Sequence, residues 1–220
     1  MTSRTSTPST EKTLEITRLR LGLHLPAERI ALLRKTVSAI AGETDDLLHN
    51  HASREKVIYR YPLIQYKSVE DNALILGVGS QGRQSLENLM TKPDFKAIFL
   101  ENSILEVETD TYTIKSTPSI PYRLHHYIAL NSSNLRQWQE QNSLPARAAL
   151  LERCITGHIL KFCSAVQWLL PPKSLKVELL DFRLDHTHAF NNPFLAFEVP
   201  CRSNISLPDH IGLGKAVSHG

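Results

Sequence analysis

Residues 57–82 of the chain read VIYRYPLIQYKSVEDNALILGVGSQG, and this stretch decides the fold class. Val57 to Lys67 is rich in Tyr, Val and Ile and predicts a β-strand, and Ala73 to Val78 predicts a second strand. Asp71-Asn72 is a turn signal between them, so the second strand returns antiparallel to the first. A short helix is predicted next, near residues 81–90.

The residues before this hairpin predict another strand and a helix. From Arg18 to Leu25 the residues alternate, with leucines at positions 19, 21, 23 and 25 on one face and Arg18, Arg20 and His24 on the other. Pro26 opens the helix, Gly42 is placed to end it, and its apolar stripe comprises Ile30, Leu33, Val37 and Ile40. With a further strand over residues 104–109, the order is β-α-β-β-α-β, the ferredoxin-like arrangement.

The second half predicts a looser repeat of the first. Leu124 to Leu130 is predicted as its first strand, and a long helix follows from near Pro145 to Leu170. Strands near residues 175–184 and 194–201 come next, and residues 112–121, which include two prolines, are interpreted as a connection. The sequence therefore predicts an α+β protein of two tandem ferredoxin-like (RRM-like) domains. The expected boundaries are a disordered tail over residues 1–12, a first domain over 13–110 and a second over 111–220.

Composition excludes several classes of protein. The chain has 220 residues, a formal net charge of +3 and a pI of about 8.8, which only weakly favours a polyanionic partner. The three cysteines are odd in number and lack C-x-x-C spacing, so neither a disulfide framework nor a zinc finger is indicated. No apolar stretch is long enough for a membrane span, and the Ser- and Thr-rich start lacks the apolar core of a secretory signal. We therefore expect a soluble, cytoplasmic protein.

His49-Asn50-His51 is the first candidate site. In an extended segment, residues i and i+2 point the same way, with their bases about 6–7 Å apart, so two imidazoles can flank one phosphate. One ring would accept a proton from an attacking hydroxyl and the other would give a proton to the leaving oxygen, since the unperturbed imidazole pKa is near 6.5. Two alternatives stay open: loop histidines that face water, and a metal site, although no third or fourth ligand lies nearby in the sequence.

Two glycine-rich stretches are further candidates. Gly77 to Gly82 matches G-x-G-x-x-G between a strand and a helix, which favours a dinucleotide site. A Rossmann unit needs a parallel β-α-β run, however, so the antiparallel hairpin favours a tight strand-to-helix corner. Residues 212–220 hold three of the nine glycines, and successive backbone N–H groups can cradle phosphate. Lys215 and His219 would supply positive or donor groups there, and the alternative is a flexible tail that is partly packed.

The remaining histidine pairs and the helix cysteines are weaker candidates. His125-His126 lies in a predicted strand, where neighbouring side chains point to opposite faces. Core or surface roles are expected for this pair and for His186-Thr187-His188. Cys154 and Cys163 lie in the long predicted helix and are expected to pack in the core.

These residues together resemble a known family. Leu48 to His51, Tyr59 to Lys67 and Gly77 to Gly79 are similar to the N-terminal half of CRISPR-associated repeat endoribonucleases, in the branch that carries paired histidines. The glycine-rich loop of the same family is similar to Ser203-Asn204, Leu207 to Lys215, Ser218 and Gly220. The matched blocks cover about a third of the chain and follow the family's order. The family's loop usually continues past the position of Gly220 with another glycine.

The resemblance implies two tandem ferredoxin-like domains and metal-independent cleavage of a CRISPR precursor transcript within its repeats, which releases guide RNAs. The 2′-hydroxyl upstream of the scissile phosphate attacks, leaving a 2′,3′-cyclic phosphate and a 5′-hydroxyl. His49 and His51 match the catalytic histidines, and Tyr59 is the nearest match to an accessory tyrosine. The residues expected to contact RNA are Arg18, Arg20, Lys67, Gly212, Gly214, Lys215, His219 and Gly220.

The expected partner is CRISPR repeat RNA, and a CRISPR effector complex is a further candidate. No metal, cofactor or membrane partner is predicted, and both a monomer and a homodimer stay open. The alternative function is a binding module that holds repeat RNA without cutting it. A nucleotide-dependent oxidoreductase is a third class, which would rest only on the Gly77 to Gly82 motif.

Overall fold

The computed structural model describes residues 10–42, 45–49, 51–53, 56–57, 60–100, 105–189, 192–215 and 217. The chain divides into two compact units, which we call the N-unit (Leu14–Tyr112 with Ala216–Gly220) and the C-unit (Met1–Thr13 with Thr113–Lys215). Strands β1 (Glu11–His24) and β6 (Leu105–Tyr127) each contain residues of both units. β1 begins inside the predicted tail, whose residues 1–9 lie outside the described part of the chain.

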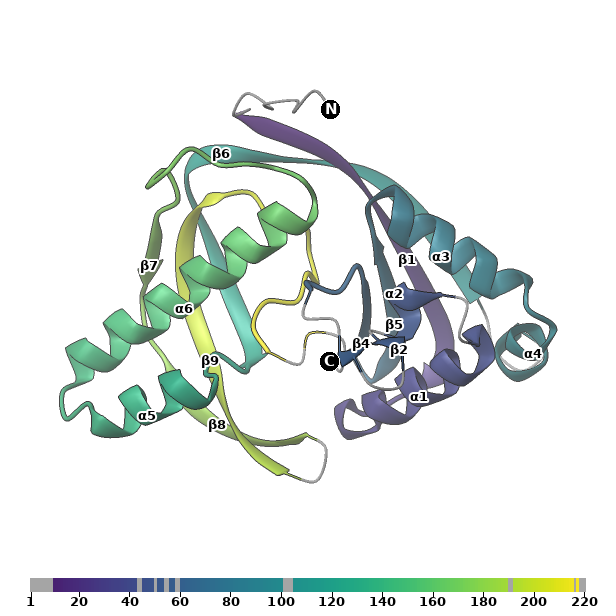
Figure 1. Cartoon of the computed structure of the whole chain (residues 1–220), viewed down its shortest axis with the longest axis horizontal. Helices are drawn as coiled ribbons and strands as arrows, with labels where there is room; N and C mark the ends of the chain where they lie inside the picture. The colour runs from purple at the N-terminus through teal and green to yellow at the C-terminus, as the bar shows by residue number, and fades with distance from the viewer. Residues whose placement is uncertain are drawn as a thin grey trace. The chain divides into compact units, whose positions relative to one another are not determined.

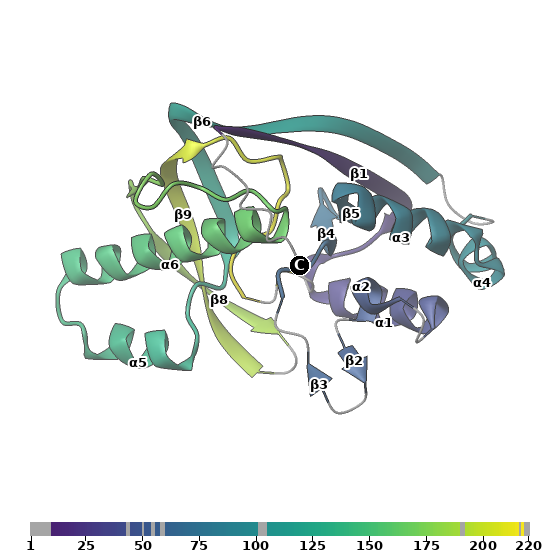
Figure 2. The same cartoon turned by 45° about the horizontal axis from the view of Figure 1, so that its top comes forward.

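The N-unit has the β-α-β-β-α-β order that the sequence predicts. Its sheet runs in the order β4 (Ile64–Val69), β5 (Asn72–Val78), β1 and β6, and β5 is antiparallel to both β4 and β1. Helices α1 (Ile30–Ala41) and α3 (Gly79–Thr91) cover one face of this sheet (Figure 1). Shorter elements complete the unit: η1 (Ala27–Arg29), α2 (Asp46–His49), β2 (His51–Ser53), β3 (Lys56–Val57), α4 (Pro93–Phe95) and η2 (Lys96–Leu100). Strands β2 and β3 pair only with each other among the described strands and stand apart from the larger sheet (Figure 2).

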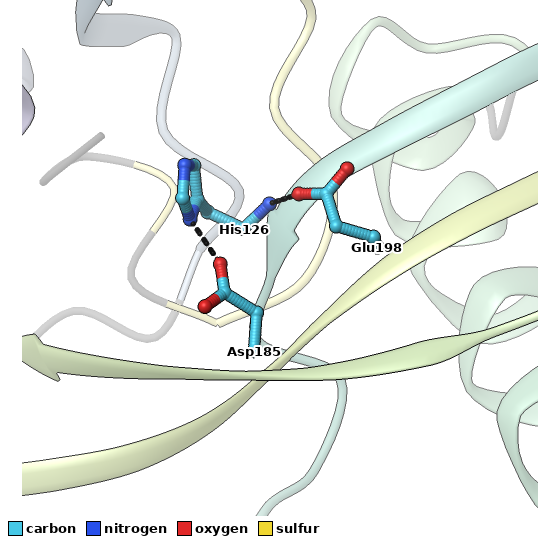
Figure 3. Close-up of side chains that lie close together, drawn as sticks. All are labelled: His126, Asp185 and Glu198. Atoms are coloured by element: carbon cyan, nitrogen blue, oxygen red, sulfur yellow. Dashed lines mark hydrogen bonds and ion pairs between the residues drawn. The ribbon is translucent and has the colours of Figure 1, made fainter.

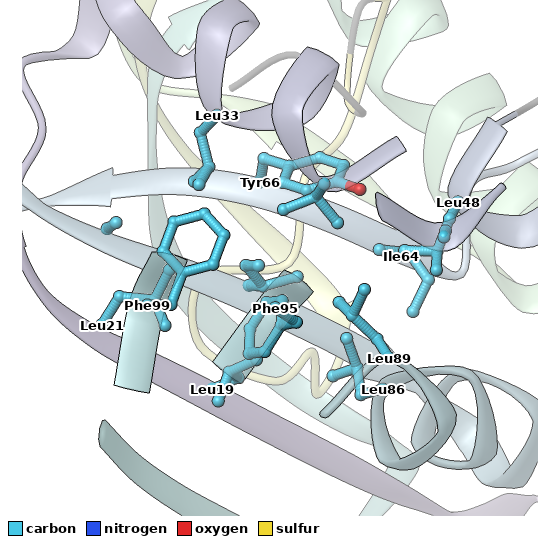
Figure 4. Close-up of a cluster of buried hydrophobic side chains, with 14 of the residues drawn as sticks. Leu19, Leu21, Leu33, Leu48, Ile64, Tyr66, Leu86, Leu89, Phe95 and Phe99 are labelled. Carbon is cyan, nitrogen blue, oxygen red and sulfur yellow. The ribbon is translucent and has the colours of Figure 1, made fainter. Parts of the chain in front are cut away.

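Alternating residues of the strands build the core of the N-unit. Leu19, Leu21 and Leu25 are buried as predicted, whereas Leu23 is 38% exposed because the pairing of β1 with β5 shifts register between Leu21 and His24. Side chains from α1, α3 and α4 pack onto the strands. The residues labelled in Figure 4 are Leu19, Leu21, Leu33, Leu48, Ile64, Tyr66, Leu86, Leu89, Phe95 and Phe99.

The Gly77 to Gly82 motif forms the predicted strand-to-helix corner. A Cβ added at Gly77 would lie 2.8 Å from the carbonyl carbon of Gly82, and one at Gly82 would lie 3.0 Å from the carbonyl oxygen of Leu63. Gly79, at the first position of α3, has φ +72°, which favours glycine. The glycines therefore let β5 and α3 approach closely, and β5 is antiparallel to its neighbours, so a Rossmann unit is excluded.

The C-unit packs two helices against an antiparallel sheet. The C-unit parts of β1 and β6 are neighbours, β9 (Asn192–Ile205) pairs with β6, and β7 (Val177–Leu179) and β8 (Arg183–Ala189) pair with β9. The long helix α6 (Leu144–Ala165) runs across these strands, with α5 (Ser132–Glu140) at its side (Figure 1). The buried stripe of α6 includes Leu151, Ile155, Ile159 and Phe162. Neither α6, with its 22 residues, nor any other helix among the described residues has the length and apolar character that crossing a bilayer requires.

Two predictions are corrected in this part of the chain, and one helix was not predicted. Residues 112–121 are part of β6, which continues from one unit into the other, and are not an irregular connection: Pro121 pairs with Arg202, and the register shifts between Ser116 and Ile120. Pro118 falls within this shift, where a missing N–H group breaks no regular ladder, and Pro121 removes only its own N–H group from the strand. Helix α6 ends at Ala165, five residues before the predicted end. Helix α5 was not predicted, although Asn131 caps it by accepting a hydrogen bond from the backbone N–H of Asn134.

Candidate functional site

The two predicted catalytic histidines lie at the junction of α2 and β2 in the N-unit. Helix α2 ends at His49 and β2 begins at His51, and the structure describes the backbone of both residues but not their side chains. The backbone is helical at His49 and extended at His51. The spacing expected for one extended segment therefore does not apply to this pair. Asn50 and Tyr59 lie outside the described residues.

The short helix that ends at His49 is tied to the core of the N-unit. Leu48 is buried, and its carbonyl oxygen accepts a hydrogen bond of 2.8 Å from Ser38 Oγ of α1. Just before α2, Asp45 Oδ2 accepts a hydrogen bond of 2.5 Å from Ser85 Oγ of α3. An isolated turn of four residues would not hold its shape in water, so these contacts with α1 and α3 fix the backbone that presents His49.

Three of the cations expected to contact RNA belong to the strands of the N-unit. Arg18 Nη1 lies 2.5 Å from Asp110 Oδ2, and Arg20 Nε lies 3.8 Å from Glu106 Oε2, so both arginines have carboxylate partners on β6. Lys67 is half-buried on β4, and burial lowers its pKa to about 8. Each carboxylate competes with phosphate for its arginine and offsets part of the positive charge that would attract RNA.

The predicted glycine-rich loop packs against the C-unit up to Lys215. The backbone N–H of Lys215 donates a hydrogen bond of 2.8 Å to the carbonyl oxygen of Ile128. Gly214 has φ +104°, and a Cβ there would lie 2.7 Å from the same oxygen and 2.8 Å from the ring of Tyr127. Only glycine fits this position, so the loop is held in place and not free as a tail. His219 and Gly220 lie outside the described residues.

Lys215 lines a cavity that the sequence analysis did not identify. The cavity has a volume of about 390 Å³ and lies between α5, α6 and Lys215, wholly within the C-unit. Its cations are Arg153, Lys161 and Lys215, and no carboxylate is among the described residues that line it. One signal was present in the sequence: Arg153, Gly157 and Lys161 are spaced at i, i+4 and i+8, which places them on one face of a helix.

The histidines at positions 125 and 126 occupy a β-bulge. Leu124 of β6 pairs with Val199 of β9 and Tyr127 pairs with Phe197, so two residues of β6 oppose Glu198 alone. His126 has φ +47°, in the left-handed region. The prediction that these neighbours behave as residues of a regular strand, with side chains on opposite faces, is therefore wrong at this bulge.

The bulge places the imidazoles of His125 and His126 within hydrogen-bonding distance of carboxylates. His125 Nδ1 lies 2.8 Å from Glu198 Oε2. His126 Nδ1 lies 2.9 Å from Asp185 Oδ2, and the backbone N–H of His126 donates a 3.0 Å hydrogen bond to Glu198 Oε1 (Figure 3). Among the described residues, His126, Asp185 and Glu198 form a group that could hold a metal ion, since their ligand atoms lie within 4.8 Å of one another. The carboxylates are already hydrogen-bonded to histidine groups, so the cluster is satisfied without an ion.

The cysteines are buried, as expected for Cys154 and Cys163, and none is in a disulfide. Burial raises the pKa of the Cys163 thiol to about 12 and that of the Cys201 thiol to about 11. Burial also raises the pKa of Cys154, whose Sγ accepts a hydrogen bond of 3.3 Å from Asn134 Nδ2. A thiol must ionise to act as a nucleophile, so these three side chains are packing residues.

Comparison with known proteins matches nearly the whole chain to one family. The family model of the Cas6b N-terminal domain matches residues 12–118, and that of the Cas6b C-terminal domain matches residues 114–220. An uncharacterized protein of Methanocaldococcus jannaschii is 29% identical over 94 residues, which are 43% of this chain. The matched region spans 63% of the length of that relative.

Solved structures resemble the chain along its length. A crystal structure of Cas6b has a TM-score of 0.80 at 22% identity, covering 94% of this chain and 96% of that chain. A crystal structure of the CRISPR RNA processing endoribonuclease Cas6b has a TM-score of 0.74 at 22% identity and covers 95% and 96%. Csf5, a CRISPR-Cas type IV Cas6 crRNA endonuclease, has a TM-score of 0.58 at 15% identity and covers 95% and 97%. These likenesses confirm the predicted fold of two tandem ferredoxin-like domains.

Proposed function

This chain belongs to the Cas6b family, and on that premise we propose that it is an endoribonuclease that cuts CRISPR precursor RNA within the repeats to release guide RNAs. The observation that carries the proposal is the match of the two Cas6b domain models, which together span residues 12–220. The histidine pair at positions 49 and 51 supports it, because a protein that only binds RNA does not need two neighbouring acid–base groups.

His49 and His51 supply the two proton transfers of the proposed reaction. One imidazole accepts the proton of the 2′-hydroxyl as its oxygen bonds to phosphorus. The other, protonated beforehand, gives its proton to the 5′-oxygen as the bond from phosphorus to that oxygen breaks. The products are a 2′,3′-cyclic phosphate and a 5′-hydroxyl, and Tyr59 assists the reacting groups. Imidazole suits both roles because its unperturbed pKa, about 6.5, lies near neutral pH.

The chemistry as proposed uses no metal ion, because the two imidazoles perform both proton transfers. The His49 backbone is held through Leu48 and Asp45 by α1 and α3, and this anchoring supports a fixed acid–base group at that position. The group that could hold a metal, His126 with Asp185 and Glu198, belongs to the C-unit, whereas the catalytic pair belongs to the N-unit.

Lys215 is the proposed main contact with the RNA backbone. Its side chain is exposed, and its backbone is fixed by the hydrogen bond to Ile128 and by the packing of Gly214. Gly212, His219 and Gly220 contribute backbone or side-chain donors from the same loop. Arg18, Arg20 and Lys67 are proposed as secondary contacts. Sequence-independent contacts of this kind dominate the affinity of proteins for nucleic acid.

The test combines two RNAs with four variants, all in EDTA. The RNAs are a CRISPR repeat and the same repeat with a single 2′-deoxy substitution upstream of the cut. We expect the wild type to cut the first RNA to a 2′,3′-cyclic phosphate and to bind the second without cutting it. Cleavage of the deoxy RNA would show that water attacks, and binding without cleavage of either RNA would favour the non-cutting binding module.

The variants test whether His49 and His51 perform the proton transfers. His51→Ala should slow cleavage about 10²- to 10⁴-fold, as expected for loss of a general acid or base, while binding stays within a few-fold. His49→Ala should slow it by a similar or smaller factor. His24→Ala, at an exposed position of β1 in the same unit, is the matched control and should cut like the wild type. Cleavage near the wild-type rate by the double variant of His49 and His51 would overturn the site.

A further inference from the structure

We propose that the cavity between α5 and α6 is a nucleotide subsite, which holds one phosphorylated nucleotide of the bound RNA in addition to the phosphate that is cut. The inference rests on the proposed function, since that function supplies the RNA. The volume of about 390 Å³ lies within the range of roughly 300–1,000 Å³ typical of small-molecule sites. α5 and α6 lie side by side in both views of the molecule (Figures 1 and 2).

The face of α6 that lines the cavity is built to receive an anion. Arg153, Gly157 and Lys161 follow one another at intervals of four residues, so two cations stand one turn above and one turn below a glycine. An arginine guanidinium can bind a phosphate through two parallel hydrogen bonds, and a lysine adds a point charge. This arrangement leaves the centre of the face without a side chain.

Gly157 has no explanation in the packing of the protein. It lies in the interior of a 22-residue helix, where glycine is less stable than alanine. A Cβ at this position would meet no atom within 4 Å, and the backbone does not have the positive φ that favours glycine. Glycine is used where a ligand must approach the backbone closely, and here the open space is the cavity that Gly157 lines.

The third cation, Lys215, is the last residue of the C-unit in sequence and lines the same cavity. Gly214 packs against Tyr127 and Ile128 in a conformation that only glycine fits, and the next residue, Lys215, is bonded to Ile128 through its backbone N–H. The side chain of Lys215 is thereby directed to the cavity that Arg153 and Lys161 line. Three cations and no carboxylate among the described lining residues leave a positive charge that a bound phosphate group would partly offset.

A buried histidine and polar amides complete the lining. His158 is only 8% exposed, and its Nδ1 lies 2.6 Å from the hydroxyl of Tyr127. Burial, with Lys161 and Lys215 nearby, lowers the pKa of His158 to about 4, so the ring is neutral at pH 7. Asn134 and Gln137 of α5 line the opposite side. Neutral polar groups of these types can hydrogen-bond the edge of a base, while the cations hold its phosphate.

The test exploits the opposite effects that Gly157→Ala should have on stability and on binding. The added methyl group improves helix propensity, so the melting temperature should rise by about 2–4 °C. It also projects into the cavity, so the affinity for repeat RNA should fall several-fold. Lys161→Gln should lower the affinity and reduce the slope of log K against log salt by about one. Arg136→Gln removes an exposed cation of α5 that does not line the cavity, and it should leave the slope nearly unchanged.

Small probes identify the ligand class. At equal concentration, 5′-AMP should raise the melting temperature of the wild type more than inorganic phosphate does, and Gly157→Ala and Lys161→Gln should abolish the difference. If RNA affinity and the 5′-AMP effect are both unchanged in Gly157→Ala, the subsite is overturned. If only the 5′-AMP effect is lost, the cavity binds free nucleotide and the assignment to RNA is overturned.

The experiments distinguish an error in the subsite proposal from an error in the proposed nuclease function. Gly157→Ala should raise the concentration of repeat RNA needed for half-maximal cleavage, because the cavity contributes to binding and supplies no acid or base for the cut. A wild type that binds repeat RNA but never cuts it would overturn the nuclease and leave the subsite standing if Gly157→Ala still weakens binding. A Gly157→Ala variant that binds normally but cuts slowly would overturn the subsite.

Discussion

His158 should make the stability of the C-unit fall as the solution is acidified below pH 6.5. Burial, followed by the charges of Lys161 and Lys215, lowers the pKa of this imidazole from 6.5 to about 4 in the folded protein. Between these two pH values the unfolded chain binds a proton that the folded chain does not, so acid favours unfolding. Above pH 6.5 the ring is neutral in both states, and His158 adds no pH dependence.

The size of the effect follows from the two pKa values. Their difference corresponds to about 3 kcal/mol of unfolding free energy, lost in full once the pH is well below 4. No large discount for solvent screening is needed, because the ring is 8% exposed and hydrogen-bonded to Tyr127. A loss of this size is a substantial part of the stability of an ordinary domain.

Urea denaturation at several pH values between 7 and 4 measures the effect. His158→Gln should be less stable than the wild type at pH 7, and the gap should narrow by up to about 3 kcal/mol as the pH falls. The control is Ile159→Val, at a buried neighbour on α6 that does not titrate. It should lower the free energy of unfolding by about 0.5–1.5 kcal/mol at every pH, without changing the dependence on pH. If plots of unfolding free energy against pH are parallel for the wild type and His158→Gln, the reasoning is refuted.

Three other perturbations test separate parts of the molecule. Gly77→Ala should destabilise the N-unit by about 1–3 kcal/mol, measured by denaturation, because the new Cβ would lie 2.8 Å from the backbone of Gly82; an unchanged melting curve would contradict the close approach. Lys215→Ala should reduce the salt slope of RNA binding by about one phosphate contact, whereas an unchanged slope with a lower melting temperature would assign Lys215 to packing. Cleavage should persist in EDTA for the wild type and for His126→Ala, which dismantles the group that could hold a metal; activity lost on chelation and restored by a metal ion would reject the proposed chemistry.

Local patterns predicted most of the N-unit, but the strand predicted over Val57 to Lys67 begins only at Ile64, and the pair of β2 and β3 was not predicted. The alternation along β1 and the stripe of α1 are read from neighbouring residues, and Gly42, with φ +69°, ends α1 as expected. The hairpin turn falls one residue earlier than the predicted Asp71-Asn72, since Glu70 and Asp71 both have positive φ. Two such residues form a two-residue hairpin turn, which fixes the register of β4 and β5 without information from elsewhere in the chain.

Errors arose where a distant strand decides the structure. Two prolines indicate a connection when only residues 112–121 are considered, yet β9 pairs along this stretch and makes it part of β6. The bulge at His125-His126 depends on the number of β9 residues between Phe197 and Val199, which no local pattern contains. Sequence alone could therefore not place either imidazole beside Asp185 or Glu198.

The candidate sites also divide into features that local sequence predicts and features that depend on distant parts of the chain. The face of α6 that carries Arg153, Gly157 and Lys161 could have been found from helical spacing. The addition of Lys215 could not, because it depends on how Gly214 packs against Tyr127. The pair at positions 49 and 51 was identified from its chemistry and its resemblance. The change from helix to strand between its members depends on contacts of α2 and Asp45 with α1 and α3 and on the pairing of β2 with β3.

Strands β1 and β6 are each divided between the two units, which limits where this chain can be cut to build a chimera. The carbonyl oxygen of Thr10 accepts a hydrogen bond from the backbone N–H of Ser116, and the hydroxyls of Thr13 and Thr113 lie 3.3 Å apart. A gene fusion that joins a foreign first half at Thr113 would replace this starting segment of β1. It would thereby leave the β6 edge of the C-unit with a mismatched neighbour, and poorly covered edges promote aggregation. The C-unit is therefore discontinuous in sequence: chimeras that exchange it should carry the residues around Thr10 to Thr13 together with Thr113–Lys215.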